Sequence, residues 1–364
     1  MKGLSLIAAA LLVYVVVALL AVSSPSHGPA PADAVVAPPA ATAGQATHLK
    51  GLPYRGLAMQ LQRVDWIDKY EKSIDEIAAL GGDTVSLVVD ARQENGQSTD
   101  IYVDMRKTPT VPQLSEIILH AKAKKIRVVL MPIILLDDPV NNEWRGTIKP
   151  PDWDHWFDSY RDVMEHFARI AQATGVDVFV VGSELVSTER NVDQWTRTIR
   201  SIRSIFKGQL TYSSNWDHYT VITFWNQLDL IGMNSYWTLG DDHNATVDQI
   251  VAHWKKIQKD LIPFVQKEGR PLILLEAGWC SLANAASASW DYTQATEPID
   301  LALQKRLYEG FFQSWYGNPN MGGFIMWDWP PTDGGPDDRG YTPKNKPAEQ
   351  VLREWLAKPA WTVN

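Results

Sequence analysis

The sequence contains a single cysteine, Cys280, among 364 residues, so no disulfide can form within the chain. Positive charge is scarce: 34 Lys and Arg stand against 42 Asp and Glu, and the formal net charge is −8. We find no basic stripe, which argues against nucleic acid as a partner. The chain also lacks a glycine-rich phosphate-binding fingerprint after its first predicted strand, where "LAMQLQRVDW" stands instead.

The N-terminal residues 1–23 carry no charged side chain except Lys2. Their apolar run, 4–22, is 19 residues long. About 20 residues span a bilayer, whereas a signal-peptide core usually has about 7–15. An uncleaved membrane anchor and a cleaved signal peptide both remain open, and both place the rest of the chain outside the cytoplasmic membrane. Residues 24–49 are rich in Pro and Ala and predict an extended linker.

From residue 50 to 364 short apolar runs alternate with amphipathic stretches, and the composition does not change along the way. This uniform pattern predicts one domain. Near-continuous apolar strands are typical of a parallel sheet covered on both faces. Eight strand–helix units predict an α/β fold, a (β/α)₈ TIM barrel, and a doubly wound sheet is the alternative. The predicted strands cover 54–61, 83–91, 126–135, 176–185, 209–216, 228–237, 270–279 and 321–329.

Polar and aromatic side chains follow the apolar part of most predicted strands. Because such barrels place the active site at the C-terminal ends of the strands, we expect these residues to converge there. Tryptophan is abundant, with 16 in the chain, and indoles either fill a core or offer flat platforms to sugar rings. The candidate site residues are Asp90, Arg92, Ser183, Glu184, Asn215, Trp216, Asn234, Tyr236, Glu276, Trp279 and Trp327.

Two glutamates, Glu184 and Glu276, end apolar strands four and seven. A carboxylate there is partly desolvated unless it is paired or hydrogen-bonded. Two carboxyl groups about 5–5.5 Å apart suit retaining glycoside hydrolysis, in which one is the nucleophile and the other the acid and then the base. The acid needs a raised pKa and the nucleophile needs hydrogen-bond donors, for which Tyr236 and Arg92 are candidates. The alternative is that both glutamates merely end strands or pair with basic residues.

The segments "VVGSEL", "LILLEAGW", "GGFIMWDW" and "GYTPKNKPAEQVL" resemble glycoside hydrolase family 113, the β-mannanase-like barrels of clan A. The similarity covers roughly residues 50–358. The resemblance implies that Glu184 is the general acid/base and Glu276 the nucleophile. It also implies that Tyr236 donates a hydrogen bond to the nucleophile and that Trp327 forms the floor under the sugar being cleaved.

One position departs from most of clan A. Ser183 stands immediately before the acid/base, where many relatives use Asn to bind the sugar 2-hydroxyl, although a hydroxyl residue there is compatible with family 113. We therefore expect a retaining glycosidase on β-mannan or on another β-glycan, with a carbohydrate-binding barrel that does not cleave as the remaining alternative. We expect a monomer that needs no metal or organic cofactor. Asp152 and Asp154 could hold a metal, but a helix N-cap is the simpler interpretation.

Overall fold

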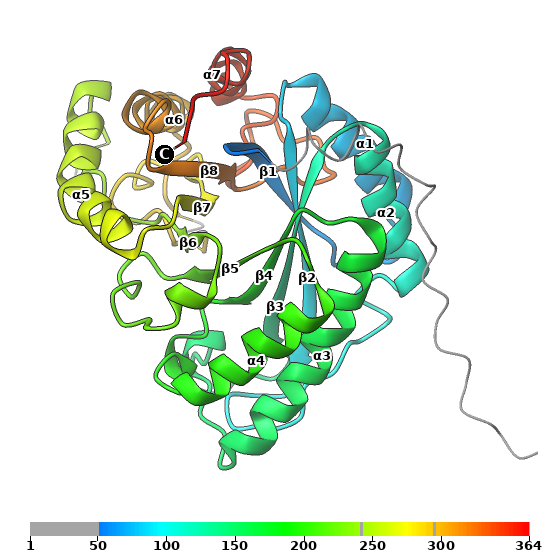
Figure 1. Ribbon diagram of the computed structural model, residues 1–364. Coiled ribbons are helices and arrows are strands. Elements are labelled where there is room, and N and C mark those ends of the chain that lie inside the picture. Colours follow the sequence, from blue (N-terminus) through cyan, green and yellow to red (C-terminus); the bar gives the residue numbers. More distant parts are fainter. Residues whose placement is uncertain (1–50, 241–242, 294–295, 364) are drawn as a thin grey trace, which may run out of the picture. The chain divides into compact units, whose positions relative to one another are not determined.

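The computed structural model describes residues 51–240, 243–293 and 296–363. Within them, eight parallel strands close into a barrel in the order β1-β2-β3-β4-β5-β6-β7-β8 (Figure 1). The predicted TIM barrel is confirmed. The predicted N-terminal segment and linker, 1–49, lie outside the described residues. Among the helices of the described ranges, none combines the length and hydropathy needed to cross a bilayer.

The elements follow the predicted order closely. The strands are β1 Tyr54–Gln60, β2 Thr84–Gln93, β3 Arg127–Leu136, β4 Val178–Ser183, β5 Gln209–Ser214, β6 Ile231–Asn234, β7 Leu272–Ala277 and β8 Met321–Met326. The α-helices are α1 Ile67–Ala79, α2 Val111–Ala123, α3 Trp153–Thr174, α4 Val192–Ile205, α5 Val247–Glu268, α6 Leu301–Trp315 and α7 Pro347–Leu356. Short 3₁₀ helices are η1 Arg145–Thr147, η2 Val186–Thr188 and η3 Trp225–Gln227.

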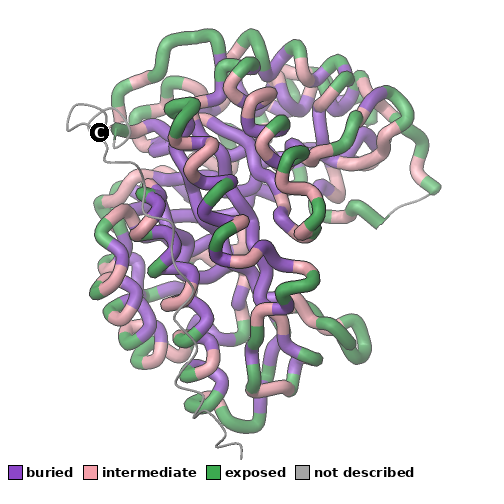
Figure 2. The backbone as a smooth tube through the Cα atoms, turned by 90° about the vertical axis from the view of Figure 1, so that its right-hand side faces the viewer, coloured by how far each residue is buried: buried purple, intermediate pink, exposed green. Residues whose placement is uncertain are grey.

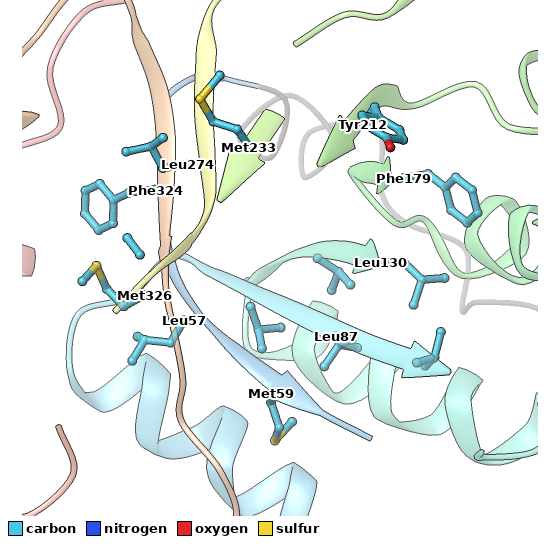
Figure 3. Close-up of a cluster of buried hydrophobic side chains, with 14 of the residues drawn as sticks. Leu57, Met59, Leu87, Leu130, Phe179, Tyr212, Met233, Leu274, Phe324 and Met326 are labelled. Atoms are coloured by element: carbon cyan, nitrogen blue, oxygen red, sulfur yellow. The ribbon is translucent and has the colours of Figure 1, made fainter. Parts of the chain in front are cut away.

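Alternation along each strand divides the core into two layers. On β3, for example, Val128 and Leu130 pack towards the helices, whereas Val129 and Met131 fill the inside of the barrel. Figure 3 shows the outer layer, to which every strand contributes a labelled side chain. Buried backbone runs through the strands and exposed backbone concentrates on the outer parts of the fold (Figure 2). Because both faces of the sheet are covered, most strands are rich in apolar residues.

The connection between β5 and β6 differs from the others, because it contains η3 rather than an α-helix in the described residues. The sequence predicts a short helix near 221–228, and the observed element covers three residues, Trp225–Gln227. The buried Trp225 ring occupies this position, its Nε1 donating to the Tyr219 carbonyl at 3.0 Å. One large indole thus fills part of the space that a helix would otherwise cover.

Candidate active site

Glu184 lies where β4 leaves the barrel. The pairing of β4 with β5 becomes irregular between Val180 and Ser183, and β4 ends at Ser183, two residues earlier than predicted. Glu184 has a positive φ of 54°, and its N–H donates to the Ser213 carbonyl at 2.8 Å. Irregularities of this kind re-aim side chains at the rims of barrels. The strand therefore delivers Glu184 to the barrel mouth, the end formed by the C-termini of the strands.

The Glu184 carboxylate has two side-chain donors. One oxygen accepts from the Arg145 guanidinium on η1, and the other accepts from the Asn234 amide at the end of β6. Burial alone would lower the pKa of Arg145, but the carboxylates of Glu184 and Glu276 raise it overall. Each oxygen of the Glu184 carboxylate therefore contacts a donor from another element.

Glu276 lies on β7 and is only 4% exposed. The Tyr236 hydroxyl donates to its Oε2 at 2.9 Å, as the sequence predicts. Ser235 holds the backbone, because its N–H and its hydroxyl both donate to the Glu276 carbonyl, at 2.8 and 2.9 Å. Desolvation and the nearby charge of Glu184 raise the pKa of Glu276 to about 8, whereas Arg145 and the hydrogen bond from Tyr236 oppose the increase. The charge of Glu184 therefore acts directly on the pKa of Glu276.

The electrostatics of the predicted nucleophile differ from the sequence-based expectation. The predicted nucleophile, Glu276, has the raised pKa. The predicted acid, Glu184, faces the cation Arg145. The physical reason is that Arg145 contacts Glu184 directly, while Glu276 is held in a nearly dry position by a neutral phenol.

Aromatic side chains line the same region. Tyr236, Cys280, Leu282 and Tyr341 form a small buried cluster, and the half-buried rings of Trp216 and Trp327 pack against it. Asn234 ties this side of the site together, because its Oδ1 accepts from the Trp216 N–H at 2.8 Å and its Nδ2 donates to Asn215 at 3.0 Å. Trp216, Trp327, Asn215, Asn234 and Tyr236 are therefore brought together around the two glutamates. Cys280 is a packed thiol, and burial raises its pKa to about 12.

Three predicted site residues, Arg92, Asp90 and Trp279, are engaged in other contacts or buried in the core. Arg92 does not contact Glu276: its guanidinium donates to Asp90 at 2.7 Å and to Asp137 at 2.6 Å. Asp90 is fully buried beneath it, and desolvation raises its pKa. Trp279 is fully buried in the outer layer of the core beside α5 and α6, so its ring offers no face to a sugar. Its side chain leaves the barrel interior because the β7–β8 register shifts between Leu274 and Ala277.

Ser183 lies at the end of β4, 1% exposed, and its hydroxyl has no hydrogen-bond partner among the described residues. The alternative in which Asp152 and Asp154 hold a metal ion is not supported by the structure. Asp152 caps α3, accepting from the His155 N–H at 3.0 Å. Across the described ranges, no cluster of three or more His, Cys, Asp or Glu side chains could hold a metal ion.

Arg145 is the site residue that sequence reasoning missed. It lies in the long connection between β3 and α3, where no strand period or motif marks it. A signal did exist, because it is the first basic residue after a run of 17 residues from 128 to 144 that contains none. That connection follows the strand next to β4 and can reach the Glu184 carboxylate. A cation in such a loop is a candidate partner for a neighbouring catalytic carboxylate.

Comparison with known proteins decides the family. The sequence model of Glycoside Hydrolase Family 113 matches residues 58–346, most of the chain. The chain belongs to glycoside hydrolase family 113. The family 113 barrel therefore acts as a glycoside hydrolase, in agreement with the presence of Glu184 and Glu276 at the barrel mouth. Among curated proteins, no match is found.

Solved structures of the same family resemble this family 113 chain. A GH113 β-1,4-mannanase complex is 25% identical over 84% of this chain and 98% of its own, with a TM-score of 0.76. The GH113 β-mannanase of Alicyclobacillus acidocaldarius in complex with ManMIm is also 25% identical, over 84% of this chain and 97% of its own, with a TM-score of 0.75. A β-glucuronidase of Faecalibacterium prausnitzii shares the fold alone, at 14% identity, 86% and 50% coverage and a TM-score of 0.59.

Proposed function

We propose that this family 113 hydrolase is a retaining enzyme that cleaves β-linked polysaccharide, with β-mannan as the first candidate substrate. The observation that carries the proposal is the placement of Glu184 and Glu276 at one end of the barrel by β4 and β7, with Arg145 donating to Glu184 and Tyr236 to Glu276. Solved relatives at 25% identity are described as β-1,4-mannanase and β-mannanase, which supports mannan over other β-glycans.

In the proposed mechanism Glu276 attacks the anomeric carbon while Glu184 protonates the leaving glycosidic oxygen. The bond between the anomeric carbon and that oxygen breaks, and a covalent bond to Glu276 forms. Glu184 then removes a proton from water, which displaces Glu276 and regenerates both carboxyl groups. The raised pKa of Glu276 adds a requirement: this carboxyl group must be ionised when substrate is bound if it is to attack.

The surrounding side chains supply the proposed sugar contacts. Trp327 and Trp216 offer half-buried rings for stacking, and the amide of Asn215 lies beside Asn234. The unpartnered hydroxyl of Ser183 is the candidate for a hydroxyl of the bound sugar. Asp90 and Arg92 form an ion pair near the C-terminal end of β2, and we expect this pair to shape the site rather than to bind sugar. We also propose, from the N-terminal sequence, that the domain acts outside the cytoplasmic membrane, either secreted or anchored.

The decisive experiment joins a substrate panel to a trap. Wild type, Glu276→Ala and Glu184→Ala are incubated with β-1,4-linked manno- and gluco-oligosaccharides, and the wild type is treated with a 2-fluoro glycoside before peptide mapping. We expect mannan fragments to be cleaved and the label to be on Glu276. Label on Glu184 would reverse the two roles. No cleavage of any β-glycan would leave a binding protein.

A further inference from the structure

Glu184 occupies a backbone conformation that needs external support. Its φ of 54° lies in the left-handed region, which is unfavourable for a residue with a side chain. Such a conformation persists only where the surroundings hold it. The following N–H, that of Leu185, donates to the hydroxyl of Tyr212 on β5 at 3.0 Å. A side chain from the neighbouring strand thus fixes the backbone just after the catalytic carboxylate.

Tyr212 is held in turn by a buried carboxylate. Its hydroxyl donates to Oε1 of Glu189 at 2.9 Å, and Nδ1 of His218 lies 2.7 Å from the other Glu189 oxygen. Glu189 is fully buried, and Tyr212 lies within the apolar outer layer (Figure 3). Desolvation raises the pKa of Glu189, while the contacts with His218 and Tyr212 oppose the increase. A buried charge pair is weak evidence for stability by itself, because apolar replacements often serve as well.

The same contacts lead back to the carboxylate of Glu184. The backbone N–H of His218 donates to the backbone carbonyl of Asn215 at 3.0 Å. The side-chain oxygen of Asn215 accepts from the Asn234 amide, also at 3.0 Å. Asn234 also donates to the Glu184 carboxylate. These contacts, joined through the covalent structure of His218 and Asn215, lead from the N–H that follows Glu184 to the Glu184 side chain. Both the backbone and the carboxylate of one residue are held by a single ring of contacts.

We propose that Glu189, acting through Tyr212 and His218, is a positioning residue that orients Glu184 for proton donation. The proposal rests on the proposed function, in which Glu184 is the general acid. An orientation error of about 1 Å at a catalytic group can cost about 100-fold in rate. Proton donation matters most when the leaving group is a sugar and least when the leaving group is already a stable anion, because such a group departs without a proton.

The test compares two leaving groups in the full chain. We would measure kcat/KM, which reports the steps up to the glycosyl-enzyme, with a β-linked oligosaccharide and with a dinitrophenyl glycoside of the same sugar. Tyr212→Phe and Glu189→Gln are expected to lower kcat/KM about 10–100-fold for the oligosaccharide and less than about threefold for the dinitrophenyl glycoside. We expect the same difference between the two substrates for His218→Gln. The His218 side chain is 30% exposed, so a folding defect is least expected in this variant.

Tyr160→Phe is the matched control. Tyr160 is also fully buried, and its hydroxyl donates to the Val181 carbonyl at 2.8 Å, but it does not contact Leu185 or Glu189. Its kcat/KM should stay within about twofold of wild type for both substrates, whatever its melting temperature. Equal losses with both leaving groups, or no loss in Glu189→Gln and His218→Gln, would overturn the proposal. The proposed function would instead be refuted if the wild-type protein cleaved neither substrate. It would also be refuted if Glu184→Ala cleaved the oligosaccharide as fast as the wild type.

Discussion

At the scale of single residues, the site depends on one cation placed beside two carboxyl groups. Arg145 lowers the pKa of Glu276 against desolvation and against the charge of Glu184. Arg145→Met should therefore move the pKa of Glu276 above about 8. If Glu276 must be ionised to attack, the acid limb of the kcat/KM profile moves to higher pH. For every pH unit that the limb moves, the rate at a given pH on that limb falls about tenfold.

Arg145→Lys is the matched variant for this prediction. It keeps the positive charge while changing the hydrogen-bond geometry, so its acid limb should stay near that of wild type even if its maximal rate falls. The measurement is kcat/KM between pH 4 and pH 10 for the three proteins. An acid limb that does not move in Arg145→Met would show that ionisation of Glu276 does not control the reaction.

The same buried carboxyl predicts a pH-dependent stability. Because the folded-state pKa of Glu276 is about 8 and its ordinary value is 4.5, the folded protein holds this proton more tightly than the unfolded chain. Its contribution is fully present below about 4.5 and is lost as pH rises through 8. Glu276→Gln removes the titration, so it should gain at least about 2 °C in melting temperature relative to wild type at pH 9, and less at pH 5.

Calorimetry or circular dichroism across this range checks the difference between the two proteins. The exposed Glu354 on α7 provides the control, since Glu354→Gln should leave the pH dependence of wild type unchanged. Parallel pH curves for wild type and Glu276→Gln would contradict the prediction.

At the scale of elements, the ends of β4, β6 and β7 decide where the site lies. Their register becomes irregular after Val180, Met233 and Leu274. The apolar runs predicted which strands deliver Glu184 and Glu276, because a carboxylate after such a run is conspicuous. They could not predict that Trp279 faces the helices, because one residue of register reverses the direction of a side chain. Arg145 escaped prediction because a loop has no period from which its direction can be read.

Gly182 shows how closely β4 is packed behind Glu184. A Cβ at this position would lie 2.7 Å from the Trp195 ring and 2.9 Å from the Tyr212 ring. Gly182→Ala should therefore displace Tyr212, destabilise the fold by about 1–3 kcal/mol and lower activity on oligosaccharides. Gly51→Ala, where the added Cβ meets no atom within 4 Å, is the control for stability and activity. Denaturant titration and the oligosaccharide assay together check both effects, and wild-type activity in Gly182→Ala would contradict the expected displacement.

At the scale of the whole domain, the (β/α)₈ architecture could be predicted because the helical and apolar periods repeat along the chain. Each predicted strand occurs, and the predicted boundaries differ mainly where a strand leaves the barrel, as at Ser183 and Asn234. These periods cannot predict the electrostatics of the site, since the pKa of Glu276 depends on Arg145, Tyr236 and Glu184, which come from three other parts of the chain. Fold follows from local pattern, whereas the charge state follows from tertiary contacts.

The last residues of the described chain contact the two strands that close the barrel. Arg55 on β1 donates to the Lys358 carbonyl at 2.8 Å, and the Trp361 indole donates to the Met321 carbonyl of β8 at 2.9 Å. The Trp361 ring also lies 4.8 Å from that of Tyr316. The tail thus contacts the first and last strands where they pair.

Deleting residues 358–364 from a chain that begins at residue 50 should therefore destabilise the domain. Loss of the Trp361 packing and of these hydrogen bonds is expected to cost about 2–4 kcal/mol. The chain 50–364 is the control: it retains the Pro53 carbonyl, which accepts from Arg127 at 2.7 Å, and should match the full-length protein in melting temperature and activity. Denaturant titration compares the two chains. Equal stability of 50–357 and 50–364 would mean that the strand pairing of β1 with β8 closes the barrel without the tail.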